Sequence, residues 1–282
     1  MSKQLILKFL GTAFIFTIGM IAVWACLNTW LTGNIWNGMT ISKSALTVEY
    51  CEFNNTEKLF HQSMNTYSNL AYFFFGILIL QIAKYDFNNK ENAGQNRLEK
   101  FPLLSALMGF CFIYLSFGSA FFHASLTYLG QRVDMNGTYS ISIALLGIGF
   151  YHFFHKIVFS ETAKKLWIGG LLVIIIAFLP ISLMISSSKL LPAMIFLLLL
   201  NIVIHYIQFR KHKSFILAIL GFVLMFVAVN IRTLDVQKIN CDPHSFYQGH
   251  SIWHLLTAMS SFCSYAFYRF SKIQVYKQTS KN

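Results

Sequence analysis

The stretch that decides the fold is Pro102–Ala124, which reads PLLSALMGFCFIYLSFGSAFFHA. It contains no Asp, Glu, Lys or Arg, and about 20 such apolar residues suffice for an α-helix to cross the hydrocarbon core of a bilayer. A helix also satisfies its own backbone hydrogen bonds in lipid, where water cannot do so. We therefore predict that this stretch is a transmembrane helix.

Seven further stretches on either side have the same apolar character and a comparable length. Over the whole chain of 282 residues, 56% are hydrophobic and only 11% are charged, which is typical of membrane proteins. The predicted fold class is all-α, a polytopic membrane helical bundle. The predicted spans are Phe9–Trp30, Ser63–Ala83, Pro102–Ala124, Val133–His155, Leu166–Ile185, Leu190–Phe209, Ser214–Ile231 and His250–Phe270.

Basic residues are divided unevenly between the segments that connect these spans. If the N-terminus lies inside, sixteen of the 22 Lys and Arg residues fall on the inner side and six on the outer side. Cytoplasmic loops retain positive charge, so we expect both termini to be cytoplasmic. The net charge of +12 is spread over several inner segments, which fits topology and anionic lipid better than nucleic-acid binding.

The first span has a second interpretation. Lys3 and Lys8 before an apolar run resemble a signal peptide, and Val23–Cys26 resembles a lipoprotein cleavage site. The length of the run favours a retained anchor. We expect a bacterial cytoplasmic membrane, with the ER or Golgi as the alternative, because no sorting signal is evident.

Polar side chains at the outer ends of the spans indicate a metal site. His250 and His254 are four residues apart and share one helical face, and His123 lies at the outer end of another span. Three imidazoles leave the fourth position of a tetrahedral zinc ion open to water, as in catalytic zinc sites. The sequence therefore predicts Zn²⁺ as a cofactor, and we expect Ser119 and Asp134 to lie beside it.

The alternative for each histidine taken alone is an interfacial side chain, and a His-x-x-x-His pair also arises by chance. Three histidines and a carboxylate that meet on one face favour metal chemistry. Asp134 is the only carboxylate that we place inside a span. We assign the other histidines to interfacial or solvated positions (His61, His152, His155, His212), to a helix contact (His205) and to a spare ligand (His244).

Three segments resemble the alkaline ceramidase family, over about Glu49–Phe270. They are Phe117–Ser125 followed by Asp134, then Gly249–His254, and earlier Glu49–Asn54 with Asn65–Asn69. The superfamily also contains the adiponectin and progestin receptors and the phospholipases that remodel GPI anchors. The resemblance implies a seven-helix domain over residues 49–271, an additional helix within 1–48, and a cytoplasmic tail over 272–282.

The resemblance implies an activity as well. By this resemblance, His123, His250 and His254 hold zinc, and Ser119 and Asp134 surround the metal-bound water. The expected reaction is therefore hydrolysis of the amide of a ceramide-like lipid. The alternatives are a receptor or sensor that holds zinc without turnover, and a lipid esterase or phospholipase. We expect the acyl chains in a cavity lined by aromatic residues such as Phe121, Phe122, Tyr139 and Trp253. The alternative for these rings is plain packing or contact with lipid.

The same resemblance implies that the segment beginning at Glu49 binds a second metal ion. The family binds calcium there, and the matching positions are Glu49, the Tyr50 carbonyl, Glu52, Asn54 and Gln62. Oxygen ligands suit calcium, but Gln62 and Tyr50 stand where the family has Glu and Trp. Without the resemblance, this acidic stretch is a solvated loop. The residues after Asp134 also differ, since the family usually continues with Glu, Leu and Pro.

Cysteine placement indicates which thiols share a compartment. Cys51 and Cys241 lie in outer segments, whereas Cys26, Cys111 and Cys263 fall within spans. Only the first two would face an oxidising side. The resemblance implies a disulfide between Cys51 and Cys241, because the family pairs its early cysteine with one before the last helix. The alternative is two unpaired thiols.

Overall fold

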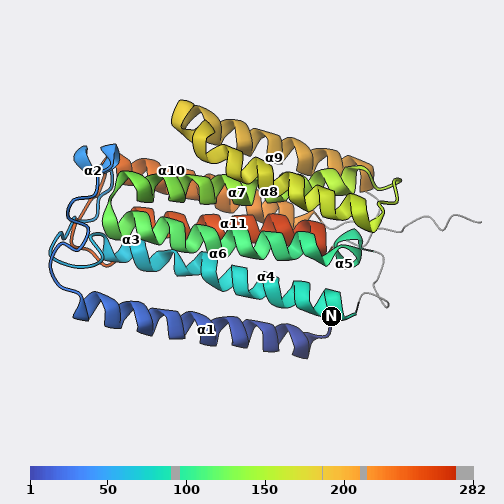
Figure 1. Ribbon diagram of the computed structural model, residues 1–282, viewed down its shortest axis with the longest axis horizontal. Helices are drawn as coiled ribbons and strands as arrows, with labels where there is room; N and C mark the ends of the chain where they lie inside the picture. The colour runs from blue at the N-terminus through green and yellow to red at the C-terminus, as the bar shows by residue number, and fades with distance from the viewer. Residues whose placement is uncertain (90–95, 186, 210–214, 271–282) are drawn as a thin grey trace, which may run out of the picture.

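The computed structural model describes residues 1–89, 96–185, 187–209 and 215–270. Its long helices lie side by side along one axis (Figure 1). They are α1 (Lys3–Trp30), α4 (Leu70–Asn88), α6 (Pro102–Ser125), α7 (Tyr128–Phe153), α8 (Glu161–Met184), α9 (Ser187–Phe209), α10 (Ile216–Val236) and α11 (Gly249–Arg269). Short helices connect them at α2 (Lys43–Leu46), α3 (Ser63–Ser68) and α5 (Arg97–Lys100).

These elements confirm the predicted fold class, a polytopic all-α membrane protein. Six helical stretches of the described chain, counting α3 and α4 as one, are long and apolar enough to cross a membrane. The helices α7 and α11 do not meet that criterion, because both carry many polar side chains. Those side chains face the interior of the bundle, as with Asn136 and Ser140 of α7 and Thr257 and Ser260 of α11.

The link between α6 and α7 is very short and sets the geometry at one end of the bundle. Leu126 ends α6 in the left-handed conformation, and the Thr127 hydroxyl then accepts from the backbone N–H of Gly130. A Cβ atom on Gly137 would meet the Leu115 Cα at 2.9 Å, so the two helices are in close contact. A short connection of this kind makes consecutive helices antiparallel neighbours.

At the opposite end, buried charges hold three elements together. Arg269 of α11 donates to both carboxylate oxygens of Asp86 on α4, and to Glu99 of α5 at 2.8 Å. Charges at this depth persist only when they are paired and hydrogen-bonded. Asn and Gly residues within Asp86–Gln95 predict a solvated loop there, and this prediction is wrong at its start, because α4 continues to Asn88. Residues 90–95 of that loop lie outside the described residues.

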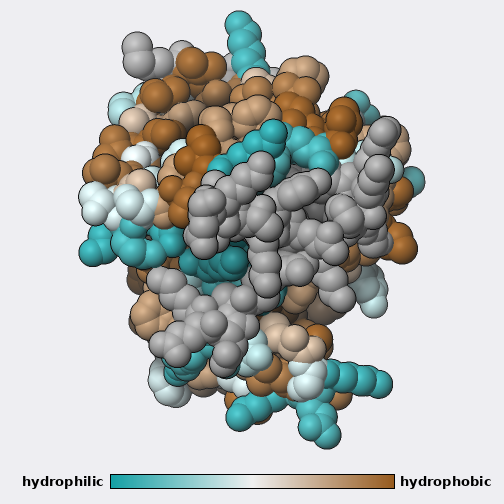
Figure 2. Space-filling view, turned by 90° about the vertical axis from the view of Figure 1, so that its right-hand side faces the viewer, coloured by the Kyte–Doolittle hydropathy of each residue, from teal (hydrophilic) through white to brown (hydrophobic). Residues whose placement is uncertain are grey.

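The additional helix α1 lies along the edge of the bundle, beside α4 (Figure 1). Its contacts are few but specific: Trp24 packs against Phe60 and Phe117, and Gln81 of α4 donates to the Phe9 carbonyl at 3.0 Å. The N-terminus of α1 lies at the same end as α5. Figure 2 shows that end face, where hydrophilic residues are gathered between hydrophobic side walls, as expected where helices leave a bilayer.

Candidate metal centre

Three histidines from two helices meet at the end of the bundle opposite the N-terminus. His123 comes from the last turn of α6, and His250 and His254 come from the first two turns of α11. The Nε2 atoms of His123 and His250 are 3.2 Å apart, and one ring nitrogen from each of the three lies within 4.8 Å of the others. All three side chains are buried.

The surroundings turn the ε-nitrogens of two rings inward. The Gln62 Oε1 atom lies 2.7 Å from His123 Nδ1, and an amide oxygen only accepts, so this Nδ1 carries the proton. The Ser68 hydroxyl donates to the Asn65 carbonyl at 2.9 Å and therefore accepts from His254 Nδ1 at 2.7 Å. Each ring thus keeps a free Nε2 lone pair, which is how outer hydrogen bonds orient metal-bound imidazoles.

The spacing of these nitrogens fits a tetrahedral metal ion. With metal–nitrogen bonds of 2.0–2.1 Å, two nitrogens of a tetrahedral zinc site are about 3.3 Å apart. The observed 3.2 Å between His123 Nε2 and His250 Nε2 is close to that distance. Tyr50 stacks on the outer face of the His250 ring, with centroids 3.9 Å apart, and limits its rotation. The group can therefore hold a metal ion.

A cavity of about 420 Å³, the metal-centre cavity, opens beside the histidines. Ser119 lies one turn before His123 and hydrogen-bonds Asp134, which the short α6–α7 link brings to the same end. The cavity thus joins a metal-binding group, a carboxylate and a hydroxyl. Its lining comprises Glu49, Tyr50, Tyr72, Leu115, Ser119, Asp134, Met135, Thr138, Leu191, Pro192, Arg232, His250, Trp253 and His254.

A family model described as Ceramidase matches residues 42–282. The chain belongs to the ceramidase family. Searches of curated proteins and of solved structures gave no match. Because the matched region begins at residue 42, α1 lies outside the part that this chain shares with the family.

Arg232 also lines the cavity, although it is not among the site residues predicted from the sequence. Its guanidinium forms an ion pair with Glu49 at 3.0 Å, hydrogen-bonds the Tyr50 hydroxyl, and lies 5.9 Å from the Trp253 ring centroid. In the sequence it is one of the six basic residues on the outer side. The available signal was its position near the end of an apolar span, where an ionisable residue is a functional candidate.

The predicted aromatic lining of the cavity is correct only for Trp253. Phe121 packs against Trp36 with ring centroids 5.5 Å apart, and Tyr139 packs against Phe178. Phe122 is buried beside Tyr50 in a separate cluster. These rings therefore fill the core instead of facing the cavity.

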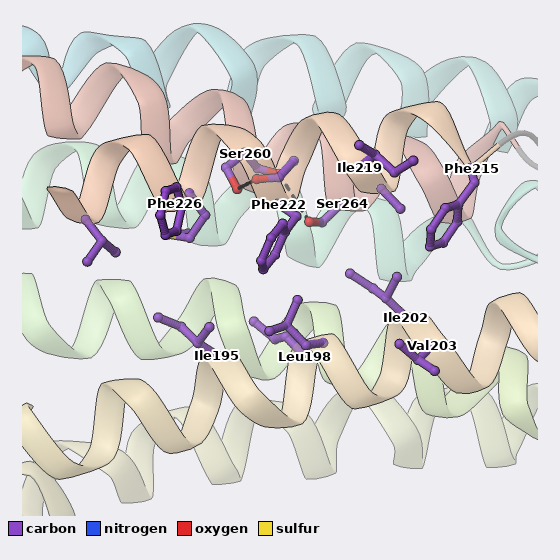
Figure 3. Close-up of a pocket in the computed structure, with 15 residues that line it drawn as sticks. Ile195, Leu198, Ile202, Val203, Phe215, Ile219, Phe222, Phe226, Ser260 and Ser264 are labelled. Atoms are coloured by element: carbon purple, nitrogen blue, oxygen red, sulfur yellow. Dashed lines mark hydrogen bonds between the residues drawn. The ribbon is translucent and has the colours of Figure 1, made fainter. Parts of the chain in front are cut away.

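A second cavity of about 420 Å³, the apolar groove, lies one helical turn beyond the metal-centre cavity, toward the other end of the bundle. Leu191 lines the cavity and Ile195, one turn further along α9, lines the groove. Figure 3 shows the apolar side chains of α9 and α10 that face one another across it, such as Leu198 and Phe222. Ser260 and Ser264 of α11 provide its polar atoms.

Four of the five residues expected to bind calcium, Glu49, Glu52, Asn54 and Gln62, have protein partners for their side chains. Glu49 pairs with Arg232, and Glu52 accepts from the backbone N–H groups of Met64 at 2.6 Å and Asn65 at 2.8 Å. Glu52 is buried, and burial raises its pKa to about 7, so it does not belong to a solvated loop. The Gln62 amide donates to Asn54 Oδ1 at 2.7 Å. This donor set does not fit a calcium ion, which needs several unengaged oxygens.

Cys51 and Cys241 form a disulfide, with their Cα atoms 5.7 Å apart. The Asp235 carboxylate reinforces the same junction, because it accepts from the backbone N–H of Cys51 and from that of His250, each at 3.2 Å. A Cβ on Gly249 would meet the Asp235 Cβ at 2.9 Å, so glycine allows this close contact. The early loop, residues 49–62, is thus fixed to the first turn of α11.

The remaining histidines lie apart from the metal centre. His61 and His152 are buried, so their expected interfacial or solvated positions are wrong. His205 is a buried helix contact, with its ring 5.1 Å from that of His152. His244 is exposed, packs against Phe53 and is not in the metal-binding group. His212 lies outside the described residues.

Proposed function

We propose that this ceramidase-family protein hydrolyses the amide bond of a ceramide-like lipid and releases a sphingoid base and a fatty acid. One observation carries the proposal: two members of a group of three buried histidines, His250 and His254, line the same cavity as a carboxylate and a hydroxyl. The donor set and spacing fit Zn²⁺, with His123, His250 and His254 as ligands. When bound, zinc would polarise the substrate carbonyl and lower the pKa of a water molecule.

The side chains have separate tasks in this proposal. Asp134 accepts a proton from the attacking water and returns it to the amide nitrogen as the C–N bond breaks, which balances the reaction. The Ser119 hydroxyl, which hydrogen-bonds Asp134 in the free protein, turns to donate to the developing oxyanion. Tyr72 and Trp253 cover the cavity and restrict water.

The lipid chains have an apolar route away from this polar centre. The groove between α9 and α10 begins one turn beyond the metal-centre cavity and is lined almost entirely by aliphatic and phenyl groups (Figure 3). We assign one acyl chain to it. The Glu49–Arg232 pair also lines the cavity, and we assign it to the hydroxyl groups of the headgroup.

The proposed orientation follows from the fold and the basic residues together. The metal centre lies at the end of the bundle opposite the N-terminus of α1. If both termini are cytoplasmic, as the basic residues predict, the site faces the periplasm, the cell exterior or an organelle lumen. A disulfide at that same end agrees with an oxidising side.

The test is incubation of purified, zinc-loaded protein with ceramides, N-acyl amino lipids and phospholipids, followed by mass spectrometry. We expect fatty acid and sphingoid base from ceramide, in equal amounts. Preferential cleavage of a phospholipid would instead identify an ester hydrolase, because the same chemistry attacks an ester carbonyl. Bound zinc with no product from any lipid would favour a receptor or sensor.

A further inference from the structure

Gln62 connects the early loop to His123 through two hydrogen bonds. It lies just before α3 and is 2% exposed. Its backbone N–H donates to the His123 carbonyl at 3.0 Å, and its side-chain Oε1 lies 2.7 Å from His123 Nδ1. One residue thus fixes both the backbone and the ring of a proposed zinc ligand.

Both the oxygen and the nitrogen of the Gln62 side-chain amide form hydrogen bonds. Oε1 accepts from His123 and also from Asn65 Nδ2 at 3.2 Å, and Nε2 donates to Asn54 Oδ1 at 2.7 Å. A carboxylate could replace the accepting end but not the donating end, because an ionised carboxylate has no proton to give. It would instead place a negative charge against the Asn54 oxygen, and a cation would be needed between them.

The neighbouring acidic residues are also engaged by protein partners and leave few oxygens for a cation. The Glu49 carboxylate is paired with the Arg232 guanidinium, and both Glu52 oxygens accept backbone N–H groups. An incoming calcium ion needs six to eight oxygen ligands. It would have to break the Glu49–Arg232 ion pair and the Gln62–Asn54 hydrogen bond, and leave buried donors without acceptors.

We propose that Gln62 is a positioning residue that holds His123 in its Nδ1-protonated form, and that its amide link to Asn54 replaces a calcium ion in this ceramidase. The inference rests on the proposed function, since it takes His123 as a zinc ligand. Zinc binding is therefore independent of calcium, and the early loop acts on the metal centre through neutral hydrogen bonds and the stacking of Tyr50 on His250.

The experiment measures zinc affinity by competition with a chromophoric chelator, in buffer free of calcium and again with added CaCl₂. The variants are Gln62→Met, which keeps the side-chain volume without the hydrogen bonds, and Gln62→Glu, which keeps only the accepting end. The matched control is Gln81→Ala, which removes a partly buried glutamine amide that contacts α1, far from the histidines. Thermal unfolding with and without CaCl₂ is recorded for each protein.

We expect the wild-type protein and Gln81→Ala to bind zinc with the same affinity in both buffers. Gln62→Met should bind zinc about 10–100-fold more weakly in both, as is usual when the hydrogen-bond partner of a metal ligand is lost. Gln62→Glu should become calcium-responsive, with a higher unfolding temperature and tighter zinc binding after CaCl₂ is added. If Gln62→Met does not fold, the calcium response of Gln62→Glu decides the matter.

Two results would overturn the inference while leaving the zinc site intact. One is a wild-type protein that binds zinc more tightly when calcium is added. The other is a folded Gln62→Met, or a Gln62→Glu, that behaves like the wild type in both buffers. A wild-type protein that binds no zinc would overturn the proposed metal centre, and this inference with it, and is recognised before any variant is compared.

Discussion

At the scale of single residues, the proposed chemistry depends on which ring nitrogen faces the metal. Gln62 and Ser68 each occupy an Nδ1 atom and leave the Nε2 atoms of His123 and His254 free. The rings are therefore oriented before any ion arrives. Such preorganisation is what a catalytic zinc site requires from its outer hydrogen bonds.

The first prediction concerns the ligands. We expect about one zinc per chain in the purified protein, as for a three-histidine site with one open position. His250→Ala and His254→Ala should each lose most of this zinc and all measurable hydrolysis, because two imidazoles remain. Elemental analysis of detergent-purified protein measures the zinc, and size-exclusion chromatography shows that the variants stay folded. Full zinc content in both variants would exclude the site.

The second prediction separates chemistry from metal binding. Ser119→Ala and Asp134→Asn should keep about one zinc per chain, because neither side chain is in the histidine group. Ser119→Ala should lower kcat about 10²–10³-fold, the usual effect of removing one oxyanion donor. Asp134→Asn should lose at least as much, since an amide cannot accept the proton. Wild-type rates in zinc-loaded variants would refute these roles.

The residues predicted from the sequence and those missed differ in a simple way. His250 and His254 are four apart on one helix, and His123 and Asp134 flank a short link, so local spacing indicates them. Arg232 and Glu49 are 183 positions apart, and so are Arg269 and Asp86. Residues so far apart in the sequence meet only when the helices pack, so no local sequence pattern indicates them. The calcium prediction is not supported by the structure for the same reason. Arg232 contacts Glu49 of the early loop only in the folded chain.

At the scale of elements, the early loop and the first turn of α11 form one unit. The Asp235 carboxylate connects them directly, and the Cys51–Cys241 disulfide and the Phe53 N–H, which donates to the Pro243 carbonyl at 2.9 Å, fix the early loop to the segment just before α11. The loop in turn holds Gln62 and Tyr50 against the histidines. Loosening this junction should therefore affect the metal centre without changing any ligand.

The third prediction tests that junction. Reduction of the disulfide, or the pair of substitutions Cys51→Ser and Cys241→Ser, should lower the free energy of unfolding by about 2–5 kcal/mol, which is typical for loss of a native disulfide. Hydrolysis should fall as well. Thermal unfolding and activity are the measurements, and Cys26→Ser serves as the control because Cys26 is exposed on α1 and unpaired. An equal effect of all the substitutions would argue against a special role for the junction.

At the scale of the whole molecule, the two ends of the bundle differ in character. One end carries the disulfide, the early loop and the proposed metal centre. The other end carries the Asp86–Arg269–Glu99 cluster and α5. The metal-centre cavity and the apolar groove succeed one another along the bundle, so a lipid can keep its headgroup near one membrane face and its chain within the bilayer.

The fourth prediction concerns orientation. Single cysteines introduced in a protein lacking Cys26, at exposed Leu46 near the metal centre and at exposed Lys156 near the other end, should differ in reactivity. In intact cells or spheroplasts, a membrane-impermeant maleimide should label Leu46→Cys, and should label Lys156→Cys only after the membrane is opened. The reverse pattern would place the metal centre in the cytoplasm.

The distribution of the ligands along the chain also determines when a nascent protein becomes competent. His123 is made early, whereas His250 and His254 belong to α11, the last of the long helices. A ribosome-bound chain that ends before α11 therefore has one ligand and no closed centre. Metal loading has to follow insertion of that helix, so translation products that stop short would remain in the membrane without lipid-cleaving capacity.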